Sequence, residues 1–109
     1  MLVELSIMPL GSETHLSSRL AEILKMIDAS GLAYQLTPMG TCLEGNWDEV
    51  MTLVRRCHEK ARQFSPHVVT MLKIEDDENA VNKLTTNVQH VEEKVGHPLL
   101  RIPAVAVLT

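Results

Sequence analysis

The chain has 109 residues, 45% hydrophobic and 22% charged, proportions typical of one globular domain with a small core. Its net charge of −4 disfavours nucleic-acid binding, because phosphate contacts need a basic surface. One Trp, one Tyr and one Phe are too few to stack bases, and no apolar run approaches the roughly 18 residues of a membrane-spanning helix.

The chain begins with a predicted strand and a predicted helix. Residues 2–9 alternate between apolar and mixed positions, the period of a strand with one buried face, and Pro9 and Gly11 are expected to end it. Ser12 and Thr14 are candidate caps of a helix whose apolar residues then recur every three or four positions. Gly31 is expected to close this helix.

Two short strands and a second helix follow. Residues 32–37 and 41–45 predict a β-hairpin around a turn at residues 38–40. Asn46 is a favourable N-cap, and Glu49 three positions later completes the pattern of a capping box. The apolar face expected for this helix, which Pro66 stops, consists of Trp47, Val50, Met51, Val54, Cys57, His58, Ala61 and Phe64.

The last third of the chain predicts a strand, a helix and an apolar tail. Residues 67–75 are rich in β-branched side chains, and a third helix is expected from about Ala80 to Val95. Residues 96–109 form a C-terminal extension, and its tail from Leu99 onward is too apolar to remain in water. We expect it to add an edge strand or to dock onto a partner subunit.

The order of these elements predicts an α+β fold. A β-α-β-β-α-β series indicates a ferredoxin-like sandwich of four antiparallel strands with two helices on one face. We expect a single domain over residues 1–109, with its core at about 2–95 and an additional C-terminal helix and apolar tail. The other sheet face lacks a cover within one chain, so self-association as a homodimer or homotetramer is expected.

The potentially reactive side chains favour structural roles. Cys42 and Cys57 form no CxxC pair, and both fall at apolar positions, which favours buried reduced thiols and a cytoplasmic location. His58 is adjacent to Cys57, but neighbouring helix residues diverge by about 100°, so a catalytic pair is not expected. His90, Glu93 and His97 have a spacing that can bind zinc, but Gly96 interrupts the helix between them. No metal site, cofactor or enzyme activity is therefore predicted.

The hairpin contains the most informative candidate site. Glu44 lies at the end of its second strand, with Thr37 and Thr41 in the same hairpin. A carboxylate here can accept hydrogen bonds from an aminopyrimidine or face a positive charge. It can equally point to water or bond to main-chain N–H groups near a helix N-terminus. Both interpretations remain open on sequence grounds.

Several segments resemble the small thiamine-binding family (DUF77, MTH1187/YkoF-like). The resemblance covers roughly residues 3 to 95, and Glu78 stands where family members usually have Arg. It is carried by LSIMPLG at 5–11, SGLAYQLTPMGTCLEGNWDEV at 30–50, CHEKA at 57–61 and VVTMLKIEDD at 68–77.

This resemblance implies a ferredoxin-like fold, dimers formed through the open sheet faces, and binding of thiamine or its precursor hydroxymethylpyrimidine without catalysis. It further implies that the first strand and the hairpin face the ligand, with Ser6, Met8, Thr37, Thr41 and Glu44 as site residues. An oligomeric structural or regulatory module without a small ligand is the alternative, because this fold serves many functions.

Overall fold

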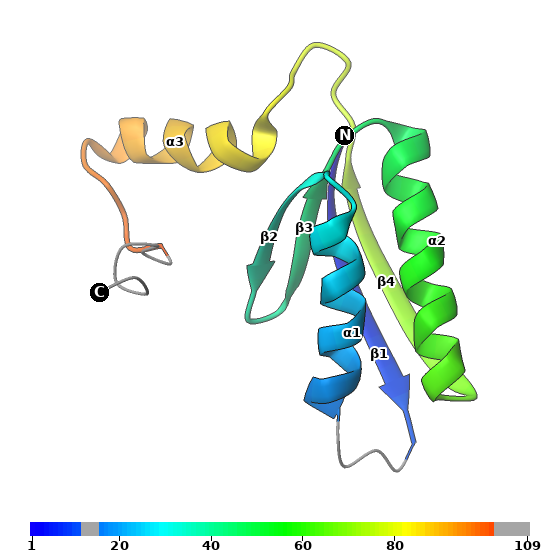
Figure 1. The fold of residues 1–109 in the computed structure, drawn as a ribbon. Coiled ribbons are helices and arrows are strands. Elements are labelled where there is room, and N and C mark those ends of the chain that lie inside the picture. The colour runs from blue at the N-terminus through cyan, green and yellow to red at the C-terminus, as the bar shows by residue number, and fades with distance from the viewer. Residues whose placement is uncertain (12–15, 102–109) are drawn as a thin grey trace.

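A computed structural model describes residues 1–11 and 16–101 and confirms the ferredoxin-like α+β fold. Its elements are β1 (Leu2–Leu10), α1 (Leu16–Ala29), β2 (Ala33–Thr37), β3 (Gly40–Glu44), α2 (Trp47–Phe64), β4 (His67–Glu75) and α3 (Lys83–Val95). The strands form one antiparallel sheet in the order β2-β3-β1-β4. Helices α1 and α2 cover one face of it, and α3 projects beyond β2 (Figure 1). The candidate caps Ser12 and Thr14 lie outside the described residues.

Strand β1 has two neighbours of unequal length. It pairs with β4 from Leu2 to Leu10 but with β3 only from Leu2 to Leu5, so β1 and β4 continue past the tip of the β2–β3 hairpin (Figure 1). Strand β1 ends at Leu10, directly before Gly11, whereas Pro9 lies within the strand. A proline is tolerated here because β1 has a strand on only one side at this point, so the missing N–H can face away from β4.

The core lies between the sheet and the two helices. Alternate residues of the strands point toward α1 and α2, as the period of two requires. The buried apolar residues are Val3, Leu5, Ile23, Ile27, Leu43, Val50, Leu53, Val54, Cys57 and Ala61. The opposite sheet face is open and carries Met8, Val69 and Met71.

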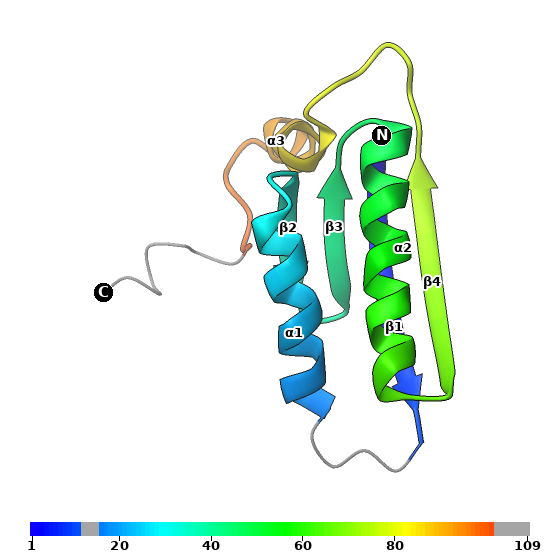
Figure 2. The same cartoon turned by 45° about the vertical axis from the view of Figure 1, so that its right-hand side comes forward.

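Helix α2 begins at the predicted capping box. The Asn46 side chain accepts a hydrogen bond from the Glu49 N–H at 2.8 Å, and the Glu49 carboxylate accepts from the Asn46 N–H at 3.4 Å. The prediction that Trp47 belongs to the core is wrong, since this residue is 54% exposed. Helix α2 starts at one end of the sheet (Figure 2), and Trp47 is its first residue. The buried face begins one turn later, at Val50.

The adjacent residues Cys57 and His58 have separate structural roles. Cys57 is buried in the core, and burial raises the pKa of its thiol to about 11. His58 lies 2.6 Å from the Thr70 hydroxyl through its Nδ1 atom, so it connects α2 to β4. Its half-buried position and its hydrogen-bonded neighbour agree with the structural role expected from the sequence.

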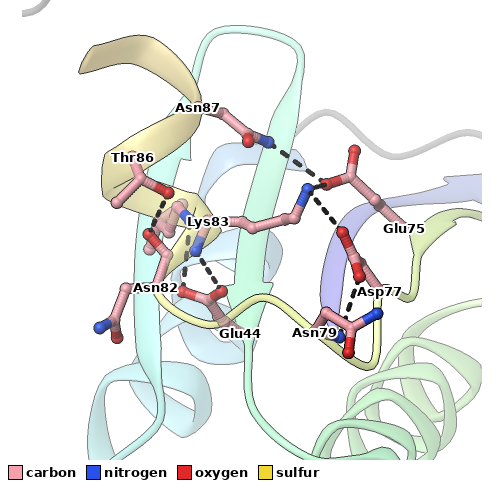
Figure 3. Close-up of polar contacts among 9 residues, drawn as sticks. Glu44, Glu75, Asp77, Asn79, Asn82, Lys83, Thr86 and Asn87 are labelled. Carbon is pink, nitrogen blue, oxygen red and sulfur yellow. Dashed lines mark hydrogen bonds and ion pairs between the residues drawn. The ribbon is translucent and has the colours of Figure 1, made fainter. Parts of the chain in front are cut away.

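Helix α3 is attached to the sheet at its N-terminus by charged groups. It begins at Lys83, later than predicted, because Asn82 has a left-handed backbone with φ of 60°. The Glu44 carboxylate accepts hydrogen bonds from the main-chain N–H groups of Lys83 at 2.7 Å and Leu84 at 3.3 Å (Figure 3). These two N–H groups have no partner within the helix, so Glu44 caps α3.

The Lys83 side chain adds two ion pairs to this attachment. Its ammonium group lies 2.8 Å from Glu75 and 3.5 Å from Asp77 (Figure 3). The hydrogen bond between them lowers the pKa of the Glu75 carboxyl and raises the pKa of Lys83. The Glu75–Lys83 pair therefore stabilises the folded state at neutral pH and is lost as pH falls through the lowered pKa of Glu75. No residue of α3 is buried, so these polar contacts largely define its position.

Two kinds of feature are absent from the described residues. No helix within residues 1–11 and 16–101 is long and apolar enough to cross a membrane. No group of three His, Cys, Asp or Glu side chains in the same ranges is arranged to hold a metal ion. Gly96 ends α3 before His97, as expected, so His90, Glu93 and His97 do not share one helix.

Replacement of Asn46 by Ala removes the capping acceptor from α2. We expect it to lower the free energy of unfolding by about 1 kcal/mol, the usual loss for an N-cap side chain. Urea denaturation followed by circular dichroism measures this loss. Asn79→Ala is the matched control, because no hydrogen bond of the Asn79 side chain occurs among the described residues. Equal stability of Asn46→Ala and the wild type would contradict a stabilising role for the capping box.

Replacement of Glu44 by Ala removes the cap of α3. We expect amide hydrogen exchange at Lys83 and Leu84 to accelerate about fivefold, corresponding to about 1 kcal/mol of local stability. The core amides of β1 should keep their exchange rates. Glu78→Ala, at an exposed acidic position outside these contacts, is the control. Unchanged exchange at both α3 amides would show that Glu44 does not hold the helix.

Candidate functional site

The five predicted site residues fall on both faces of the sheet. Ser6 and Met8 of β1 and Glu44 of β3 belong to the open face, because they alternate with residues that point toward the helices. Thr41 faces the helices and is buried beneath them. Thr37 is the last residue of β2, at the hairpin turn. The structure therefore does not bring all five side chains together.

A cavity of about 200 Å³ lies between α1 and the tip of the hairpin. It occupies the place where β3 has ended and β1 continues, so the unequal strand lengths create it. Of the predicted site residues it includes Ser6, Thr37 and Thr41, whereas Met8 and Glu44 are absent from its walls. The described residues around it are Leu5, Ser6, Ile7, Leu20, Ile23, Leu24, Ile27, Leu36, Thr37, Pro38, Met39, Gly40 and Thr41.

Thr41 is the polar side chain most deeply set in these walls. It is only 5% exposed, and its hydroxyl makes no hydrogen bond within the described part of the chain. It is also not one of the fully enclosed atoms without a partner, so the hydroxyl keeps some access to the cavity. A hydroxyl in this position can both donate to and accept from a bound molecule.

Thr37 uses its hydroxyl within the hairpin. It donates to the Gly40 carbonyl at 2.8 Å and accepts from the N–H groups of Met39 at 3.2 Å and Gly40 at 3.1 Å. These bonds fix the turn that forms one end of the cavity. Thr37 is therefore a positioning residue for the cavity wall. Gly40 is needed beside it, because an added Cβ would lie 2.9 Å from the Leu5 carbonyl oxygen.

The main chain of β1 provides a second polar element that side-chain patterns do not reveal. Met1 and Gly45 exchange both main-chain hydrogen bonds, at 2.9 and 3.1 Å, so Met1 points its polar groups toward β3. With a period of two, Val3, Leu5 and Ile7 point the same way. Ile7 lies beyond the end of β3, so its N–H and C=O face the cavity without a strand to pair them in the described chain.

Glu44 lines a separate and more open hollow at the other end of the hairpin. That hollow, of about 390 Å³, also includes Met1, Ala33, Gly45, Asn46, Val81 and Asn82. Both carboxylate oxygens of Glu44 accept hydrogen bonds from α3. Of the two sequence interpretations, the structure shows bonding to a helix N-terminus, and the helix is α3, which is distant in sequence.

Comparison with known proteins places the chain in a family. Residues 3–92 match the family described as thiamine-binding proteins. A UPF0045 protein of Methanothermobacter thermautotrophicus is 38% identical over 95 residues, covering 84% of this chain and 96% of the relative. The UPF0045 protein YqgV of Bacillus subtilis is 30% identical over 98 residues, covering 84% and 94%.

Solved structures show the same fold. A hypothetical protein of Methanocaldococcus jannaschii superposes with a TM-score of 0.77 at 26% identity, covering 84% of this chain and 95% of that one. A Thermotoga maritima protein, provisionally described as a thiamine biosynthesis or salvage protein, superposes with a TM-score of 0.67 at 23% identity, covering 86% and 92%. The extent of the family match and the identity to the archaeal relative show that this chain belongs to the thiamine-binding protein family.

Proposed function

We propose that this protein binds the pyrimidine part of thiamine, or free hydroxymethylpyrimidine, in the cavity between α1 and the hairpin. The observation that carries the proposal is the Thr41 hydroxyl, which is nearly buried at an apolar cavity and has no hydrogen bond within the described residues. An aminopyrimidine offers an exocyclic amine that donates and ring nitrogens that accept. Thr41 and the main chain of Ile7 together supply both kinds of partner.

The size of the cavity favours a single ring. Pockets for drug-sized ligands have volumes of about 300–1,000 Å³. At about 200 Å³ this cavity suits one ring with small substituents, packed against Leu20, Leu24 and Leu36. The cationic thiazolium of thiamine would then remain at the mouth, in water, where the net charge of −4 is compatible with it.

The chemistry of the walls favours binding over catalysis. The described residues around the cavity include no Asp, Glu, His, Lys or Cys. General acid–base catalysis needs a titratable group within hydrogen-bond reach of the reacting atom. We therefore propose a carrier or sensor of the pyrimidine and not an enzyme. Met8 and Glu44 are not part of this revised site.

Isothermal titration calorimetry with hydroxymethylpyrimidine, thiamine and thiamine phosphate tests the proposal. We expect the three ligands to bind with similar affinity, because they share the ring held in the cavity. Thr41→Val keeps the shape of the side chain and removes the hydroxyl, so it should weaken binding about tenfold, the effect of one lost hydrogen bond. Thr52→Val, at an exposed position of α2, makes the same chemical change outside the site and should have no effect.

The outcomes distinguish a ligand site at Thr41 from a ligand site at Glu44. No heat and no thermal shift at millimolar concentrations of all three ligands would overturn the proposal. Glu44→Gln is expected to leave affinity unchanged, because Glu44 lines the other hollow. Loss of affinity in Glu44→Gln together with normal affinity in Thr41→Val would move the site to Glu44.

A specific observation also favours self-association. The open sheet face exposes Met8 at 51% and Met71 at 63%, with Val69 beside them. Helix α3 adds exposed Val88, Val91 and Val95. Exposed apolar patches of this kind typically mark protein interfaces. We propose that two copies meet through their open sheet faces, as a homodimer or as part of a homotetramer, and Met8 acts in that contact.

Multi-angle light scattering measures this association. The wild type should have at least twice the mass of one chain, and Met71→Asp should shift it toward the monomer, because an unpaired carboxylate is costly in an apolar interface. Met39→Asp makes the same change at an exposed position of the hairpin tip and should keep the wild-type mass. A monomeric wild type at micromolar concentration would rule out the interface.

A further inference from the structure

The large apolar side chains of the open sheet face all lie on its two long strands. Strands β1 and β4 are paired over their whole length, which places Met8 opposite Val69 and Ser6 opposite Met71. The shorter strands contribute small or polar side chains to this face, namely Ala33, Gln35, Cys42 and Glu44. A second copy that covers the apolar side chains must therefore lie over β1 and β4, the strands that run past the hairpin tip in Figure 1.

One cross-strand pair of opposite charge lies on the same two strands. Glu4 of β1 is opposite Lys73 of β4, and both residues are exposed. No ion pair or hydrogen bond joins these two side chains among residues 1–11 and 16–101. A second copy over this surface would take water from both charges, and a buried charge without a partner is costly. Association through this face therefore requires a group of opposite sign beside each of them.

The symmetry of a dimer decides which side chains meet. Two identical faces are related by a two-fold axis that lies between them. An axis parallel to the strands, between β1 and β4, lays β1 of each copy over β4 of the other copy at the same level. Met8 then faces Val69 of the partner subunit, and Glu4 faces Lys73 of the partner subunit. Apolar side chains meet apolar side chains, and each charge meets its opposite.

An axis across the strands gives a poorer match. When it passes between the levels of Ser6 and Met8, it also brings the apolar side chains of the two copies together. Each strand then lies on its own counterpart in reverse, so that Glu4 faces Leu10 of the partner subunit. A carboxylate on a leucine side chain gains no partner. The charges therefore favour the axis parallel to the strands.

We propose that reciprocal contacts between Glu4 of one copy and Lys73 of the other fix the arrangement of the dimer. This inference rests on the proposed association of open sheet faces and adds its specificity. The two-fold axis repeats the contact on both sides of the interface. Complementary charges at an interface set the register of the partners and disfavour wrong pairings.

Charge reversal in two separate chains tests this contact. Glu4→Lys and Lys73→Glu each place like charges opposite one another in both contacts, so each variant should self-associate at least about tenfold more weakly than the wild type. An equimolar mixture restores opposite charges and should form a heterodimer with a dissociation constant near that of the wild type. Analytical ultracentrifugation measures the constants, and native mass spectrometry with one chain labelled with ¹⁵N identifies the heterodimer.

The mixture separates contacts between chains from a contact within one chain. Each chain in it still has two like charges on its own face, so a Glu4–Lys73 pair within one chain cannot explain the rescue. Glu78→Lys mixed with Lys25→Glu is the matched control, because it makes the same changes of net charge at exposed positions outside the open face. Both control variants should associate as the wild type does, without preference for the heterodimer.

The results also distinguish this contact from the association on which it rests. Circular dichroism should show the wild-type fold in every variant, because Glu4 and Lys73 are exposed. Unchanged self-association of both single variants would overturn the proposal, as would a mixture that associates no more tightly than its components. A dimeric wild type in those experiments would leave the association of open faces intact. A monomeric wild type would remove that association and the Glu4–Lys73 contact together.

Discussion

The unequal pairing of β1 is the constraint on which the candidate site depends. Nine residues of β1 are paired with β4, but only four of them are also paired with β3, because the β2–β3 hairpin is short. Beyond Leu5 the strand therefore has a free side, and helix α1 crosses above it. Because β3 does not pair this part of β1, Pro9 is tolerated inside the strand. The same unpaired side leaves room for a cavity lined by apolar side chains of α1 and by main-chain polar groups of β1. A hairpin two residues longer would fill this space with backbone.

Electrostatic capping has a different role at the other end of the hairpin. Helix α3 buries no side chain, so apolar packing does not fix it on the sheet. Glu44 and Glu75 replace that packing with hydrogen bonds to two main-chain N–H groups and to the Lys83 ammonium group. Such contacts are directional but screened by water. They hold the start of the helix and leave its valine-rich face, with Val88, Val91 and Val95, exposed.

The helices and strands follow from local sequence patterns, whereas the relative placement of the candidate site residues depends on contacts between distant parts of the chain. Period-two and period-3.6 patterns and the capping box depend on neighbouring residues, so β1, α1 and α2 could be read directly. Helical spacing places Trp47 on the apolar face of α2, but whether this side chain is buried depends on where the sheet ends. The partner of Glu44 is almost forty residues away and starts only after the left-handed Asn82, which no local pattern indicates. The sequence does indicate one feature of the hairpin: Thr41 and Glu44 are three positions apart on one strand, and an odd separation places them on opposite faces.

Thr41 also shows why the cavity is a stronger candidate site than the surroundings of the Glu44 carboxylate. In a buried strand position facing two helices, Val has the same shape and avoids the desolvation of a hydroxyl, which costs about 1–3 kcal/mol when no partner is present. Folding alone gives no reason for a threonine there, since its hydroxyl contributes no hydrogen bond within the described residues. Glu44, in contrast, is fully explained by the helix it caps. A residue that departs from the local rules of packing points to function more strongly than one that obeys them, and by this criterion Thr41, on the helix-covered face of the sheet, is a stronger candidate for contact with a ligand than Glu44.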